Sequence, residues 1–152
     1  MTDQTEATAP AVDPRLVGIR GWLVLPAIGF VLGPIVGVVM LVVALGLYSD
    51  VAAAGHGGLY ARELLVEVGL LAFLIYAATR FFGKKRNAPS TIIALLTASL
   101  VSSGLLLVIE LSEGPKVFAI ESGKQLVRSV ISAAIWIPYF RVSKRVKATF
   151  VN

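Results

Sequence analysis

Two charged residues interrupt long apolar stretches of the sequence, and these are the residues that could carry chemistry. Glu67 lies in an apolar run at residues 64–82, and Arg128 lies in another at residues 126–140. A charge near the middle of a bilayer costs several kcal/mol unless it is paired or hydrated. We therefore expect Glu67 and Arg128 to lie close together in the outer half of a helical bundle.

Two further carboxylates are candidate partners for this pair. Glu121, Gln125 and Arg128 follow i, i+4, i+7 spacing, which places them on one face of a helix. Glu110 lies near the outer end of the preceding apolar run. We predict a polar cluster centred on Arg128 and Glu67, with Glu110 or Glu121 as a further partner. It has two interpretations: a structural ion pair that sets the register of the helices, or a binding or proton-linked site open to the periplasmic side.

Other chemistry finds little support in the sequence. The single histidine, His56, lies among glycines without a partner motif, and the chain contains no cysteine. Disulfides, thiolate metal sites and a cysteine nucleophile are therefore excluded. The motifs of zinc proteases, serine hydrolases, P-loop proteins and dinucleotide-binding proteins are absent. We expect no enzyme, no catalytic residue, no metal and no cofactor.

The composition predicts a membrane protein. The chain has 152 residues, of which 57% are hydrophobic and only 15% are charged, and its mean hydropathy is +0.83. Soluble domains contain about 25% charged residues. A soluble domain of this size cannot bury so much apolar side chain, because small domains have a large surface for their volume. Most classes of soluble enzyme are therefore excluded.

The apolar runs predict the fold class, an all-α integral membrane bundle with four transmembrane helices. A span needs about 20 apolar residues, and four runs meet or approach this length: 22–48, 64–82, 91–109 and 126–140. Residues 1–17 are polar and are expected to form a disordered cytoplasmic tail. The membrane domain then occupies residues 18–152, with loops at 50–60 and 110–115.

The first run is longer than a bilayer requires. Its 27 residues would form a helix about 40 Å long. We expect a kink at Pro34, because proline cannot donate the helical hydrogen bond to the carbonyl four residues earlier. The alternative, a signal peptide cleaved near residues 52–54, would contain an apolar run of only about 7–15 residues.

The basic residues predict the orientation. Ten of the 14 Lys and Arg residues fall on one side of a four-span arrangement, three fall on the other, and Arg128 lies within a span. Since basic residues are enriched in cytoplasmic loops, both termini should be cytoplasmic. Such charges also attract anionic lipid headgroups, and no nucleic-acid partner is expected. The residues expected at the cytoplasmic interface are Trp22, Lys84, Lys85, Arg86, Trp136, Arg141, Lys144, Arg145 and Lys147.

A row of glycines marks one face of the first helix. Gly29, Gly33 and Gly37 recur every four residues, a pattern that allows the backbone of another helix to approach closely. This helix-packing face has two interpretations. It packs within the monomer, or it forms a dimer seam or a gating helix that uses the bend at Pro34.

Three segments resemble a known family. They are GIRGWLVLPA at 18–27, FFGKKRNAP at 81–89 and SVISAAIWIPYFRVSKRVKATFV at 129–151. Together they resemble the bacterial domain of unknown function 2569 family over nearly the whole chain, with Arg20 standing where a glycine is common. The resemblance implies a small four-helix protein of the bacterial inner membrane, and it implies no activity.

Two functions of different classes follow from these features. The first is an accessory or scaffold protein that binds a membrane-protein partner or a second copy of itself. The alternative is a small transporter or channel component that uses an outer-half pocket around Arg128 and Glu67.

Overall fold

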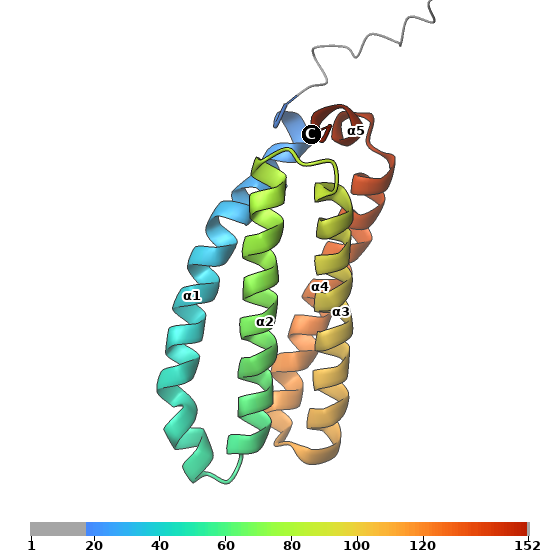
Figure 1. The fold of residues 1–152 in the computed structure, drawn as a ribbon. Helices are drawn as coiled ribbons and strands as arrows, with labels where there is room; N and C mark the ends of the chain where they lie inside the picture. The colour runs from blue at the N-terminus through green and yellow to red at the C-terminus, as the bar shows by residue number, and fades with distance from the viewer. Residues whose placement is uncertain (1–17, 152) are drawn as a thin grey trace, which may run out of the picture.

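The computed structural model describes residues 18–151, and these residues are almost entirely helical (Figure 1). The predicted disordered tail at residues 1–17 lies outside the described residues. The elements in chain order are the 3-10 helix η2 (Gly21–Leu23) and the α-helices α1 (Val24–Ala53), α2 (Gly57–Phe82), α3 (Ala88–Glu113), α4 (Lys116–Val142) and α5 (Lys144–Thr149). The all-α prediction is confirmed.

The four long helices run alternately up and down, as Figure 1 shows. Each packs against its neighbour in the chain: α1 against α2, α2 against α3, and α3 against α4. Within residues 18–151, α1 and α4 are not packed along each other. The side of the bundle between these two helices is therefore not closed by helix packing.

Three of the helices are long and apolar enough to cross a membrane: Gly21–Ala53, Gly57–Phe82 and Ala88–Glu113. Helix α4 is of similar length, with 27 residues, but its first half carries several charges. Many apolar side chains of the three helices remain exposed on the isolated chain. Such a surface is compatible with contact to lipid, since lipid tails are as apolar as leucine.

The helices extend further than their apolar runs. Helix α1 continues to Ala53 and α2 begins at Gly57, which leaves a short turn where the sequence indicated a loop over residues 50–60. Likewise α3 continues to Glu113, so Glu110 is helical. Hydropathy marks the apolar part of a helix, whereas hydrogen bonding within the backbone carries the helix beyond it. As a result, Glu63 and Glu110 lie on helices and have defined faces.

Most of the buried core lies at one end of the bundle. We call this the basic end; η2, the turn at residues 83–87 and α5 form it. Phe81 is fully buried, and its ring centroid lies 5.0 Å from that of Phe30 and 5.3 Å from that of Phe150. These contacts join α1, α2 and the C-terminal segment.

Helix α5 folds back over the basic end. The Ser143 hydroxyl accepts a hydrogen bond from the Val146 backbone N–H at 3.4 Å, which caps the start of the helix. The Gly18 backbone N–H donates to the Thr149 hydroxyl at 3.2 Å. The sequence predicted only that the basic residues of this segment lie at the cytoplasmic interface. The signal for a packed helix was the serine cap followed by Val146 and Phe150, four residues apart.

Phe81→Ala should lower the free energy of unfolding by about 3–5 kcal/mol, because it leaves a cavity in the core. The adjacent Phe82 is 45% exposed and provides a matched control, so Phe82→Ala should have a much smaller effect. Thermal unfolding in mild detergent, followed by circular dichroism, measures both. Equal losses would contradict the assignment of the core to this end.

Candidate functional site

A cavity of about 590 Å3 lies between the four long helices, and all four contribute to its wall. It extends from the half of the bundle away from the basic end to Leu74 and Leu95, which border the core of the basic end. We call the opposite end, with the turns at residues 54–56 and 114–115, the acidic end. Pockets for small molecules typically have volumes of about 300–1,000 Å3. The cavity is therefore large enough for a small molecule.

Helix α2 supplies two carboxylates to the cavity. Tyr60, Glu63 and Glu67 line it, and their spacing places them on one helix face. Both glutamates are half-buried. The sequence pattern identified Glu67 but not Glu63, which lies just before the predicted span at residues 64–82. The signal was present in the four-residue spacing between the two glutamates, and it required knowing that α2 begins at Gly57.

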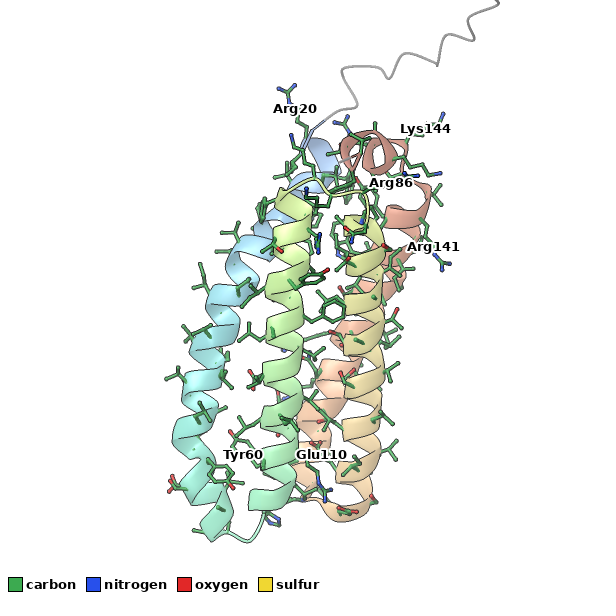
Figure 2. All side chains as sticks on the ribbon, in the orientation of Figure 1. Arg20, Tyr60, Arg86, Glu110, Arg141 and Lys144 are labelled. Carbon is green, nitrogen blue, oxygen red and sulfur yellow. The ribbon has the colours of Figure 1, made fainter. Side chains whose placement is uncertain are left out.

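Helix α3 supplies serines and a buried carboxylate. Ser99, Ser103 and Leu106 line the cavity, and Glu110 continues this row one turn nearer the acidic end. Glu110 is only 4% exposed, and its Oε2 atom has no hydrogen-bond partner. In Figure 2 Glu110 and Tyr60 lie toward the same end of the bundle. Burying a polar group without a hydrogen-bond partner is costly, so Glu110 is an unfavourable residue at this position.

Helix α4 contributes Glu121, Ser122 and Gln125 to the wall. The Lys124 ammonium donates to the Glu121 carboxylate at 2.9 Å. This hydrogen bond and the lysine charge lower the pKa of Glu121, which lies outside the apolar half of α4. Glu121 therefore remains ionised to lower pH than an ordinary glutamate.

The structure does not place Arg128 in the cavity wall. Its side chain is exposed, and within residues 18–151 the ion pairs are Arg62–Glu113 at 3.3 Å and Glu121–Lys124. The expected pairing of Arg128 with Glu67 is thus not formed. Glu121 lies about two turns earlier on the same helix and is within electrostatic reach of Arg128.

The carboxylates of the predicted cluster do come together, and they do so around Glu63. Glu67, Glu110 and Glu121 all lie within electrostatic reach of the Glu63 carboxyl. Among the described residues, Glu63, Glu67 and Glu110 form no ion pair. The cavity wall therefore carries two carboxyls, those of Glu63 and Glu67, that no ion pair among the described residues neutralises. Its chemistry favours binding a positive charge.

The cavity is polar toward the acidic end and apolar toward the basic end. Met40, Leu71, Leu74 and Leu95 line its inner part. Leu95 also belongs to the buried core, and Leu74 packs against it. The cavity thus has a carboxylate-rich outer part and an apolar floor.

An aromatic cluster lies at the acidic end beside the carboxylates. The Tyr60 hydroxyl donates to the Ala44 carbonyl at 3.1 Å, which ties α2 to α1. The Tyr60 ring stacks on Tyr48 and Phe118, with centroids 6.5 and 6.4 Å away. His56 packs edge-on against Phe118. Tyr60 is thus held in a fixed position where it lines the cavity.

The glycine face of α1 packs within the chain. A methyl group added at Gly37 would lie 2.7 Å from the Leu71 Cδ1 atom, and one at Gly33 would lie 3.1 Å from Leu74 Cδ2. These two glycines therefore allow α2 to approach α1. Gly29 has open space around it. Helix α1 continues through Pro34 and bows along its length (Figure 1).

The predicted interface residues gather at the basic end. Figure 2 shows Arg20, Arg86, Arg141 and Lys144 there, far from Tyr60 and Glu110. Every acidic residue among residues 18–151 lies in the other half of the bundle. The remaining residues of the predicted set belong to η2, the turn at 83–87, the end of α4 and α5: Trp22, Lys84, Lys85, Trp136, Arg145 and Lys147.

The family described as "Protein of unknown function (DUF2569)" matches residues 16–151. The chain belongs to this family. A curated relative, the "Inner membrane protein YdgK" of Escherichia coli (strain K12), is 29% identical, and the match covers 97% of this chain and 99% of the relative. No solved structure matches. The resemblance found in the sequence is confirmed, and with the three apolar helices it identifies an inner-membrane protein of an uncharacterised family.

Glu110→Gln should raise the free energy of unfolding by about 1–3 kcal/mol, because it replaces a buried carboxyl whose Oε2 atom has no hydrogen-bond partner and which lies within electrostatic reach of Glu63. The matched control is Glu113→Gln on the same helix. It removes an exposed ion pair with Arg62, which should change stability by about 0–1 kcal/mol in the opposite direction. Thermal unfolding in mild detergent at neutral pH measures both variants. A loss of stability in Glu110→Gln would contradict the absence of a partner for this carboxylate.

Proposed function

We propose that this protein binds a small ligand in its interhelical cavity, as a small transporter component of the inner membrane. The observation that carries this proposal is the cavity itself, with its unpaired carboxylates and its wall built from all four long helices. No arrangement of these side chains suggests a nucleophile and base, so the proposed role is binding without catalysis.

The same proposal places four spans in the membrane with both termini cytoplasmic. Helix α4 supports this, because Arg128 is the only charged residue in the mainly apolar stretch 126–140 and the helix runs alongside α3. The charges support the orientation, because the basic end carries Lys and Arg without a described acidic residue. The cavity would then open toward the periplasm, while the basic end would contact anionic headgroups.

The alternative function, a scaffold that binds a membrane partner or a second copy, relies on a free helix-packing face. Gly33 and Gly37 already contact Leu74 and Leu71 of the same chain. Two of the three glycines that favoured this function are therefore occupied within the monomer. The geometry supports the cavity better than the scaffold.

The orientation can be tested with single cysteines, because the chain contains none. In spheroplasts a membrane-impermeant maleimide should label Ser112→Cys at the acidic end. It should label Asn87→Cys and Val142→Cys, at the basic end, only after the membrane is permeabilised. Ser112 and Val142 lie near the two ends of α4, so their labelling on one side would contradict a fourth span. Reversed labelling would contradict the orientation.

Ligand binding can be tested by filling the cavity. In native mass spectrometry, wild-type protein extracted in mild detergent should carry a small-molecule adduct. Ser99→Phe, which fills the cavity, should remove the adduct. Val101→Phe is the control, because Val101 is 54% exposed on the same helix.

Circular dichroism should show that both variants are folded, and Ser102→Phe replaces Ser99→Phe if that variant does not fold. Wild-type protein without an adduct, or an adduct that persists in the filled variant, would overturn the proposed function.

A further inference from the structure

We infer that the cavity selects a lipophilic organic cation, a hydrophobic amine or quaternary ammonium compound, with its charge beside Glu63 and Glu67. This inference rests on the proposed function and names its class of ligand. The cation would direct its apolar groups toward the leucines at the floor of the cavity.

The positive charge of the proposed ligand follows from carboxylates in the wall that form no ion pair. Glu63 and Glu67 line the cavity without an ion pair among the described residues. Behind this part of the wall lies Glu110, which is 4% exposed, has no hydrogen-bond partner for its Oε2 atom and lies within electrostatic reach of Glu63. A bound cation would compensate Glu63 and Glu67 where water does so poorly.

The size of the cavity points to an organic cation. Within residues 18–151 no group of three or more acidic or histidine side chains is close enough to hold a metal ion. The carboxylates are instead distributed around a space of about 590 Å3. At about 30 Å3 per molecule, that space equals roughly 20 water molecules. A larger ligand that spreads its contacts over several helices fits this arrangement.

The aromatic and apolar parts of the cavity wall also suit a lipophilic organic cation. Tyr60 lines the cavity next to Glu63 and is held by its hydrogen bond to Ala44. Its ring also stacks on Tyr48 and Phe118, so it forms a rigid part of the wall beside the carboxylates. Deeper in the cavity, Met40, Leu71 and Leu95 offer apolar surface. A ligand with both charge and apolar groups uses the whole cavity.

The unpacked side of the bundle offers such a ligand a path. Helices α1 and α4 both line the cavity but do not pack along each other. Lipophilic cations concentrate in the bilayer near its surface. They can therefore enter between α1 and α4 from the outer leaflet, with the charge remaining toward the acidic end.

The test uses two probes of matched shape and opposite charge, tetraphenylphosphonium and tetraphenylborate. Each is measured separately by equilibrium dialysis against the full-length protein in nanodiscs of zwitterionic lipid, with empty nanodiscs subtracted. We expect saturable binding of one tetraphenylphosphonium per protein and no saturable binding of tetraphenylborate.

Three variants locate the site. Glu67→Gln should weaken tetraphenylphosphonium binding about tenfold, because it removes a charge next to the ligand. Glu63→Gln should weaken it by a similar factor, because Glu63 also lines the cavity without an ion pair. The control, Glu113→Gln, removes an exposed charge that already pairs with Arg62 and should leave the affinity within about twofold.

The outcomes separate this inference from the proposed function. Saturable binding of both probes, or tetraphenylphosphonium binding that Glu67→Gln leaves unchanged, overturns the cation selectivity. If Ser99→Phe still removes the native adduct in that case, the ligand-binding function stands. Absence of any saturable tetraphenylphosphonium binding also overturns the inference. Loss of binding in Glu67→Gln and Ser99→Phe but not in Glu113→Gln supports it.

Discussion

The packing around Phe81 determines which end of this bundle is closed. Its fully buried ring contacts Phe30 of α1 and Phe150 of the C-terminal segment, so residues more than one hundred positions apart meet at one point. Apolar groups packed this closely leave no room for a ligand. The interhelical cavity therefore begins beyond this core and continues toward the acidic end, where serines and carboxylates join the apolar side chains of its wall.

The two halves of the bundle thus have different roles. The basic half buries aromatic and aliphatic side chains and anchors both ends of the described chain through Gly18 and Thr149. The acidic half is less stable than it could be, because the buried Oε2 atom of Glu110 has no hydrogen-bond partner. Natural proteins keep such unfavourable groups mainly at functional sites. This asymmetry supports a binding role more strongly than any single residue does.

The three segments that resemble the family lie at the closed, basic end of the bundle. Two of the three segments that resemble it, residues 18–27 and 129–151, meet at the basic end through η2, the end of α4 and α5. The third, residues 81–89, contributes Phe81 itself and the turn beside it. What these segments share in this chain is closure of the bundle, together with a basic surface suited to anionic headgroups. The cavity is built largely from the segments between them.

Hydropathy and charge, which are properties of the chain in one dimension, determined much of this protein from the sequence alone. They predicted an all-helical membrane protein, the order of its helices and the grouping of Lys84, Arg141 and their neighbours at one end. Lipid makes this possible, since backbone groups in hydrocarbon must be satisfied within helices. The same reasoning found Glu67, Glu110 and Glu121 as members of one polar cluster.

Only the tertiary structure decided how these side chains are paired. The opposite charges of Glu67 and Arg128 suggested an ion pair, but Arg128 is exposed and Glu63 completes the cluster instead. Which face of a helix points inward depends on where the helix begins and on which neighbours it packs against. Hydropathy reports neither, because a polar residue near a helix end has the same hydropathy whether it faces a cavity or water. The cavity and its carboxyls without ion pairs result from which face each helix turns inward.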